Sequence, residues 1–260
     1  MKPVVDAAWL EGELGAGDLF IGDVRGPNAH ARGHIPGSKP LVLGSPPPSS
    51  DRATVEELAS EVGLRLRRHG VTGQERLVLY DRGDGVGAMP SAQLAELAGH
   101  PRVAVLLGGI AGWTGEVETG QVELDQVRVD FTPNLAALPT RDELLARLAD
   151  PELTVLDVRR PEEYTGRAGS ACDPRQGRIP GARHLEYDRL YGGDGLPLPP
   201  ERIRELVALP EGAEVVAYCH SGSRSAFATL ALRSAGYSAR NYAGSWHEWS
   251  RHPELPFETG

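Results

Sequence analysis

Residues 214–225 read Glu-Val-Val-Ala-Tyr-Cys-His-Ser-Gly-Ser-Arg-Ser, so an apolar run ends directly on a cysteine and a short polar loop follows it. An Ala- and Leu-rich stretch, residues 226–235, comes next and stops at Gly236. A strand, a tight loop and a helix in this order present a side chain where loop N–H groups and a helix N-terminus favour an anion. Cys219 is therefore predicted to be a nucleophilic thiolate.

An isolated cysteine at the end of a strand is more often a small buried core residue. Here the residues after Cys219 are polar, Gly222 allows a positive φ, and Arg224 adds a fixed positive charge. These features favour a functional loop whose N–H groups stabilise an anionic sulfur. The candidate loop residues are His220, Ser221, Gly222, Ser223, Arg224 and Ser225.

Length and composition indicate an ordinary globular chain. Its 260 residues, 40% hydrophobic and 24% charged, suffice for one large domain or two of ordinary size. No apolar run approaches the length of a membrane span, and Asp6 comes too early for a secretory signal, so we expect a cytoplasmic protein without membrane contact. The other cysteine, Cys172, is far from Cys219 in sequence, which favours reduced thiols over a disulfide.

The net charge of −9 argues against a nucleic-acid partner. Arginines are nevertheless concentrated between residues 159 and 189, where they could form a solvated mixed-charge surface or a cationic funnel for a small anion. The sequence leaves both readings open. The arginines concerned are Arg159, Arg160, Arg167, Arg175, Arg178, Arg183 and Arg189.

The chain repeats itself once, and the matching segments occur in the same order in both halves. The matches pair residues 19–25 with 154–159, 33–38 with 177–182, 76–81 with 214–219, and 108–113 with 244–249. The copies differ where chemistry is expected, because Asp81 stands where the second copy has Cys219. We therefore predict one active copy and one scaffold.

Within each copy, short β-rich runs alternate with helical patterns, which predicts an α/β fold with a mostly parallel sheet flanked by helices. Strands are expected at 18–22, 76–80, 103–107, 153–157, 214–218 and 239–242. Helices are expected at 52–69, 90–98, 140–149, 161–165, 200–207 and 225–235. The domains are expected at residues 1–117 and 135–260, with residues 118–134 as a polar linker draped over the first.

The duplicated Asp-Val-Arg strand end, the Gly-x-Ile-Pro-Gly turn, the cysteine loop and the Gly-Ser-Trp-x-x-Trp ending together resemble the two-domain rhodanese family of sulfurtransferases. The resemblance covers nearly the whole chain and implies two tandem rhodanese-like domains, with the site in the second domain near the domain interface. The related cysteine phosphatases place five residues between Cys and Arg. Four separate Cys219 from Arg224 here, which suits a persulfide better than a phosphoryl group.

The resemblance implies that a Cys219 persulfide carries sulfur from a small anionic donor to a thiophilic acceptor such as cyanide, a thiol or a protein thiol. It matches Arg167 and Arg175 to the family's donor-binding arginines, while Arg224 could contact substrate or brace the loop. Thiosulfate is the expected donor. The alternative is 3-mercaptopyruvate, for which Ser221 and His34 occupy matching positions, and Trp246 could line the mouth of the site.

No cofactor is predicted. His30 and His34 are four residues apart, but Gly33 and Pro36 interrupt a helix there and no third ligand is near, so no metal is expected. The remaining hypothesis is a non-catalytic sulfur carrier or redox sensor, in which Cys219 is modified but turnover is incidental. Steady-state turnover with a small donor and cyanide distinguishes it from an enzyme.

Overall fold

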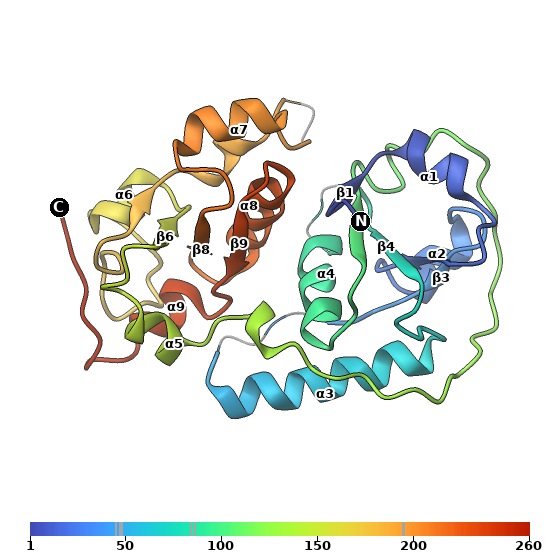
Figure 1. The fold of residues 1–260 in the computed structure, drawn as a ribbon, viewed down its shortest axis with the longest axis horizontal. Helices are drawn as coiled ribbons and strands as arrows, with labels where there is room; N and C mark the ends of the chain where they lie inside the picture. Colours follow the sequence, from blue (N-terminus) through green and yellow to red (C-terminus); the bar gives the residue numbers. More distant parts are fainter. Residues whose placement is uncertain (45, 47–48, 84, 86, 194–195) are drawn as a thin grey trace. The chain divides into compact units, whose positions relative to one another are not determined.

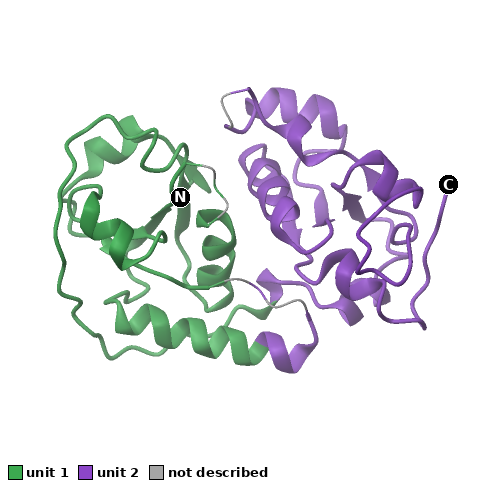
Figure 2. Ribbon diagram, turned by 180° about the vertical axis from the view of Figure 1, so that it is seen from behind, with its two compact units in different colours: residues 1–45, 56–135 green, residues 46–55, 136–260 purple. Residues whose placement is uncertain are grey.

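The structure is a computed structural model that describes residues 1–44, 46, 49–83, 85, 87–193 and 196–260 (Figure 1). The chain forms two compact units (Figure 2). Unit 1 comprises Met1–Ser45 and Glu56–Leu135, and unit 2 comprises Pro46–Val55 and Ala136–Gly260. The segment at residues 46–55 therefore comes from the first half of the sequence but packs with unit 2.

Unit 1 contains a parallel sheet in the order β1-β5-β4-β2-β3. Its strands are β1 (Val4–Val5), β2 (Leu19–Asp23), β3 (Lys39–Pro40), β4 (Arg76–Tyr80) and β5 (Val103–Leu106). Its helices are α1 (Ala7–Glu13), α2 (Pro27–Arg32), α3 (Arg52–Arg68, beginning in the segment assigned to unit 2) and α4 (Ala88–Leu97), and the short helix η1 (Leu135–Ala137) follows at its boundary.

Unit 2 contains a parallel sheet in the order β7-β6-β8-β9. Its strands are β6 (Leu153–Asp157), β7 (Arg183–His184), β8 (Glu214–Tyr218) and β9 (Ser238–Asn241). Its helices are α5 (Arg141–Ala146), α6 (Pro161–Thr165), η2 (Tyr187–Leu190), α7 (Pro200–Val207), α8 (Ser223–Ser234) and α9 (Ser245–Trp249). The two sheets and their flanking helices confirm the predicted fold class.

The central strand β8 is buried on both faces. Val215 and Ala217 belong to one apolar cluster with residues of α7 and α8, whereas Val216 and Tyr218 belong to another with Trp246 and other residues. Because successive side chains of a strand point to opposite faces, a continuous apolar run is what a parallel strand between two helical layers requires. Cys219 follows at the carboxyl end of this strand, where parallel sheets commonly present functional groups.

The ends of the predicted strands lie within one residue of the observed ends. The sequence pattern did not predict the shortest elements. The two-residue strands β1, β3 and β7 are too short to show an alternation, and the helices α1, α2 and α9 were also not predicted. Helix α2 begins at Pro27 and ends at Arg32, so Gly33, which is expected to interrupt a helix, directly follows its last residue. Among the described residues, we find no helix with the length and apolarity that a membrane crossing requires.

An ion pair occurs at the same place in both units, within the two Asp-Val-Arg repeats. In unit 2, Asp157 accepts hydrogen bonds from Arg159 Nη2 at 2.6 Å and from the Tyr218 hydroxyl at 2.6 Å. In unit 1, Asp23 accepts from Arg25 Nη2 at 2.6 Å and from Tyr80 at 2.9 Å. Each arginine also donates to a glycine carbonyl of the following turn, so the pair fastens that turn to the strand end.

Residues 118–134, the predicted linker, lie in unit 1 and run along its surface. Backbone hydrogen bonds tie this segment to α2, α3 and α4 through Gly120 to Ala31, Val127 to Arg67 and Asn134 to Leu97. In unit 2, the buried carboxylate of Glu248 accepts hydrogen bonds from the backbone N–H and the hydroxyl of Ser50, which fixes Ser50 to α9.

Candidate active site

The sulfur of Cys219 lies in a cradle formed by the loop and by the start of α8. Cys219 is buried, with 1% of its surface exposed. The Gly222 N–H donates to its Sγ at 3.1 Å, and the Ser225 hydroxyl oxygen lies 3.4 Å from it. The Gly222 N–H, the Ser225 hydroxyl and the N-terminus of α8 are thus placed where they can stabilise a negative charge on a sulfur atom.

Gly222 is the position where the loop requires glycine. Its φ of +87° lies in the left-handed region, and a Cβ there would meet the carbonyl oxygen of Ala243 at 2.7 Å. This close approach lets the chain reverse direction between Cys219 and α8, which brings the Gly222 N–H over the sulfur. Any larger residue has to displace the backbone at Ala243.

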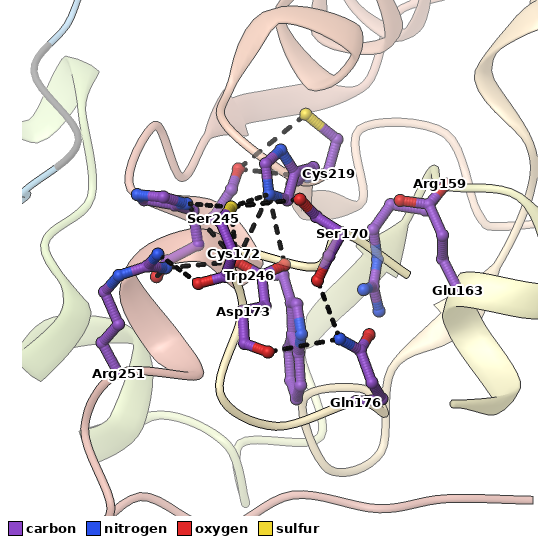
Figure 3. A network of polar contacts seen from close by, with 12 residues as sticks. Arg159, Glu163, Ser170, Cys172, Asp173, Gln176, Cys219, Ser245, Trp246 and Arg251 are labelled. Carbon is purple, nitrogen blue, oxygen red and sulfur yellow. Dashed lines mark hydrogen bonds and ion pairs between the residues drawn. The ribbon is translucent and has the colours of Figure 1, made fainter. Parts of the chain in front are cut away.

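Hydrogen bonds from α9 support the cysteine loop, and the sequence does not predict this role. The Ser245 hydroxyl accepts a hydrogen bond from the Cys219 N–H at 3.1 Å and lies 4.0 Å from its sulfur (Figure 3). The N–H groups of Trp246 and His247 donate to the carbonyls of Cys219 and His220 at 3.0 and 2.8 Å. Ser245 has a φ of +54°, an uncommon conformation for a residue other than glycine. The Gly-Ser-Trp motif thus braces the sulfur loop.

Arg224 is held by a carboxylate of α6. Its Nη1 and Nη2 donate to the two Glu163 oxygens at 2.7 and 2.9 Å, a bidentate pair. Burial lowers the Arg224 pKa, but the Glu163 hydrogen bonds and the nearby Cys219 charge outweigh it, so the net shift is upward. Burial likewise raises the Glu163 pKa, and its bond from Arg224 reverses this to a net lowering. Of the two roles expected for Arg224, this geometry favours bracing of the loop.

The other loop side chains differ in their surroundings. Ser221 and Ser223 are exposed. Ser225 is fully buried, and its hydroxyl also donates to the Gly222 carbonyl at 3.1 Å. The His220 ring lies beside Asp173, with its Nε2 3.3 Å from Oδ1 of that residue. Among the described residues, the side chains and N–H groups placed against the sulfur are therefore those of Gly222, Ser225 and Ser245.

Arg175 is committed to the fold, in contrast to its predicted role as a donor ligand. Its guanidinium donates to the backbone carbonyls of Trp249, Ser250, His252 and Leu255 at 2.6 to 2.9 Å. These bonds fasten the chain end after α9, leaving little of the guanidinium for an anion. Arg167 is exposed, and its Nε contacts only Thr165 Oγ1, at 3.3 Å, among the described residues.

Most of the remaining clustered arginines also have structural partners, which does not favour a cationic funnel. Arg159 pairs with Asp157, Arg178 contacts Glu258 and the Gly260 carbonyl, and Arg183 donates to the Val207 carbonyl. Arg160 and Arg189 are exposed, like Arg167. Few of the seven arginines are therefore available to attract an anion.

Trp246 and His34, the two remaining candidate site residues, are both buried. Trp246 is fully buried, lies 5.0 Å from the Arg159 guanidinium and donates to the Arg175 carbonyl, so it is a core residue and does not line the mouth of the site. His34 belongs to unit 1 and is 2% exposed. Its ring stacks on His30, and its Nδ1 lies 2.8 Å from the His30 carbonyl oxygen.

In unit 1, the carboxylate of Asp81 occupies the position equivalent to the sulfur. Its two oxygens accept hydrogen bonds from the N–H groups of Gly83, Gly87 and Ala88 at 2.9 to 3.1 Å. A cavity of about 860 Å³ beside it is lined in part by Arg25, Arg32 and Arg82. The loop N–H groups that could face an anionic ligand are thus satisfied by the chain's own carboxylate.

Comparisons with known proteins agree with this duplicated architecture. The family described as a rhodanese-like domain matches residues 6–116 and again residues 140–252. A thiosulfate sulfurtransferase from Azotobacter vinelandii is 31% identical, over 98% of this chain and 96% of that protein. A probable 3-mercaptopyruvate sulfurtransferase from Pseudomonas aeruginosa is also 31% identical, over 99% and 98% of the two chains.

A solved structure agrees with these matches. The crystal structure of a probable thiosulfate sulfurtransferase is 34% identical, with a TM-score of 0.75, and the match covers 93% of this chain and 98% of that one. The fold and the cysteine loop define a two-domain protein of the rhodanese type. The chain belongs to the rhodanese family of sulfurtransferases.

If the ion pair between Arg224 and Glu163 braces the cysteine loop, both partners should affect turnover equally. We expect Arg224→Gln, Glu163→Gln and the double variant to lower turnover by a similar factor, about tenfold at most, because all three remove the same partly exposed pair. The KM values for different donors should change in parallel. If Arg224 instead binds the donor, Glu163→Gln frees its guanidinium and should lower the donor KM, whereas Arg224→Gln should raise it.

The same pair has a pH signature. Because the Glu163 pKa lies below its ordinary value of 4.5 in the folded state, the pair's stabilisation is complete above that pH and is lost as the pH falls through the lowered pKa. The difference in unfolding free energy between the wild type and Glu163→Gln should therefore shrink in that acidic range.

Proposed function

We propose that the chain transfers a sulfane sulfur from thiosulfate to a thiophilic acceptor such as cyanide, with Cys219 as the only sulfur-carrying residue. The observation that carries the proposal is the cradled sulfur at the end of β8, with the Gly222 N–H 3.1 Å from Sγ. The equivalent position in the first domain holds Asp81, whose carboxylate takes up the loop N–H groups. We further propose domain limits at residues 1–117 and 135–260, joined by residues 118–134.

The reaction needs no external oxidant or reductant. The Cys219 thiolate attacks the outer sulfur of thiosulfate, the S–S bond breaks, and sulfite leaves with the bonding electrons. The product is a Cys219 persulfide, whose outer sulfur carries the negative charge. Cyanide then attacks that sulfur, thiocyanate leaves, and the Cys219 thiolate is regenerated, which is covalent ping-pong catalysis.

The loop is proposed to stabilise both the attacking thiolate and the persulfide anion. Fixed N–H groups aimed at a developing charge need no reorganisation during the reaction, which is the principle of an oxyanion hole. The proposed donors are the N–H groups of residues 220–225, of which that of Gly222 lies 3.1 Å from Sγ. Ser245, Asn241 and the Glu163–Arg224 pair hold the loop in place. The Asn241 amide contributes by donating to the Gly222 carbonyl at 3.0 Å.

Arg167 is the proposed donor-binding arginine, since it is exposed and lightly bonded whereas Arg175 is committed to backbone carbonyls. Arg167→Ala should raise the KM for thiosulfate by about tenfold or less, because the contact is exposed to solvent, and should leave transfer from a preloaded persulfide to cyanide unchanged. Arg189→Ala, which removes another exposed arginine, is the matched control. An equal loss in both half-reactions indicates that Arg167 only supports the fold.

3-Mercaptopyruvate remains the second candidate donor, because a probable 3-mercaptopyruvate sulfurtransferase is as similar to this chain as the thiosulfate enzyme. Exposed Ser221 is compatible with either donor. His34, which a mercaptopyruvate enzyme would use, is buried and engaged with His30. This arrangement supports thiosulfate.

Ser221 provides the test of donor choice. If thiosulfate is preferred, Ser221→Lys should retain or raise thiosulfate turnover, since positive charge attracts the dianion, and Ser221→Ala should change it little. Steady-state kcat/KM for both donors measures the preference. A wild-type kcat/KM for mercaptopyruvate far above that for thiosulfate, lost in Ser221→Ala and His34→Ala, contradicts the proposed donor but leaves sulfur transfer intact.

A further inference from the structure

A second cluster of chemically active side chains lies beside the sulfur loop, and the function proposed above does not use it. Cys172, Asp173, His220 and His247 each direct one potential ligand atom into a common space, and these atoms all lie within 4.8 Å of one another. Cys172 and Asp173 come from the loop after α6, His220 from the cysteine loop and His247 from α9. Figure 3 shows dashed contacts converging on the Cys172 sulfur and the Asp173 carboxylate.

Five of the six separations between these atoms are close to those of a tetrahedral metal site, and the sixth, between the two histidine nitrogens, is no more than 4.8 Å. Cys172 Sγ lies 3.8 Å from His220 Nε2, 3.7 Å from His247 Nδ1 and 3.7 Å from Asp173 Oδ1. Asp173 Oδ1 lies 3.3 Å from His220 Nε2 and 3.4 Å from His247 Nδ1. Zinc bond lengths at tetrahedral angles separate sulfur from nitrogen or oxygen ligands by about 3.5 Å, and nitrogen from oxygen by about 3.3 Å.

The burial of the Asp173 carboxylate is a second observation that points to a cation at this cluster. Its side chain is only 1% exposed, and its Oδ2 is buried without a hydrogen-bond partner, although it lies 3.2 Å from His220 Nε2. A buried carboxylate oxygen without a donor is unfavourable, and a cation at this point would satisfy it. Arg251 donates to Oδ1 at 3.1 Å, which neutralises part of the charge and fixes the orientation of the carboxylate.

The ligand atoms are also held in position by a surrounding shell. Arg251 donates to the carbonyls of Cys172 and His247, both at 2.6 Å, so one guanidinium joins two of the contributing segments. The His247 N–H donates to the His220 carbonyl at 2.8 Å, which joins the cysteine loop, the third contributing segment, to α9. Outer contacts of this kind orient metal ligands and raise their affinity.

We propose that Cys172, Asp173, His220 and His247 form a binding site for a thiophilic divalent cation, with Zn²⁺ as the best match. One thiolate, two imidazoles and one carboxylate in tetrahedral arrangement are typical zinc ligands. The sequence predicted no metal from the His30–His34 pair alone, and the four residues of this cluster are dispersed along the chain. Because His220 follows Cys219 directly, a bound ion fixes the first residue of the sulfur loop.

The test uses the full chain and the metal alone. Co²⁺ added to the reduced protein should bind at one ion per chain and give the visible bands of tetrahedral cobalt together with a thiolate-to-cobalt charge-transfer band. Zn²⁺ should displace it and raise the melting temperature. Cys172→Ser should abolish the charge-transfer band, and His247→Gln should weaken Zn²⁺ binding about tenfold or more.

Two matched variants make the result specific. Cys219→Ser keeps the four ligands and should bind Co²⁺ with an unchanged spectrum, and His252→Gln removes a histidine of the same unit outside the cluster. Exposed Cys172 tolerates serine without loss of packing, which circular dichroism verifies. The proposal is overturned if the wild type binds neither ion beyond the Cys172→Ser variant, or if the charge-transfer band depends on Cys219. If the four residues form only a hydrogen-bonded cluster, the wild type will bind Co²⁺ and Zn²⁺ no better than Cys172→Ser.

Discussion

Replacement of Cys219 by serine is expected to abolish sulfur transfer, lowering turnover with thiosulfate and cyanide by roughly 10⁴-fold or more. The serine hydroxyl cannot form a persulfide, and the loop N–H groups stabilise no intermediate in its absence. The fold should persist, since serine is close in size and Gly222, Ser225 and Ser245 still surround the position. Steady-state production of thiocyanate measures the loss.

Cys172→Ser is the matched control, because it removes the only other cysteine of the chain. Cys172 is exposed and lies near His220, so it is a plausible rival for the reactive sulfur. We expect this variant to retain most of the metal-free activity. Full activity in Cys219→Ser, or loss of activity in a folded Cys172→Ser, contradicts the assignment of the nucleophile.

Arg159→Met is expected to lower the free energy of unfolding by about 3–5 kcal/mol, the largest stability effect that we predict for a single substitution. Arg159 and Asp157 are 1% and 0% exposed at their side chains, so the variant leaves a buried carboxylate without its countercharge. The Tyr218 hydroxyl, whose pKa burial and Asp157 raise well above its ordinary value, cannot replace that charge. Urea denaturation followed by tryptophan fluorescence measures the change.

The duplication supplies an internal control for this effect. Arg25 pairs with its aspartate and a glycine carbonyl in the same way in unit 1. Its side chain is 15% exposed, so water can partly solvate Asp23 after Arg25→Met. The loss should therefore be smaller. Combining Arg159→Met with Asp157→Leu should recover part of the stability, because no buried charge then remains unpaired. A loss below about 1 kcal/mol in Arg159→Met contradicts the role given to this pair.

Some features of the site could be predicted from sequence because they are local. The apolar run of β8, the position of Cys219 after it and the glycine at residue 222 specify a strand, a loop and a helix within a short segment. The repeat, compared between the two halves, also identified Asp81 as the counterpart of Cys219. These inferences needed no knowledge of contacts between distant segments.

Other features depend on tertiary contacts that no local pattern records. Arg175 matched a donor-binding position, yet the carbonyls that it binds come from residues more than seventy positions later. Trp246 is buried because α9 packs beneath the sheet, and the pairing of Arg224 with Glu163 depends on α6 meeting the cysteine loop. The cluster of Cys172, His220 and His247 was missed for the same reason.

Intact-mass and peptide mass spectrometry after exposure to thiosulfate tests the central claim most directly. The account predicts that the wild-type chain gains one sulfur atom on the peptide containing Cys219, and that cyanide removes it with release of thiocyanate over repeated cycles. A persulfide that forms on Cys219 but does not turn over indicates a carrier instead of an enzyme. Sulfur found on Cys172, or no added sulfur while thiocyanate is being produced, contradicts a Cys219 persulfide as the intermediate.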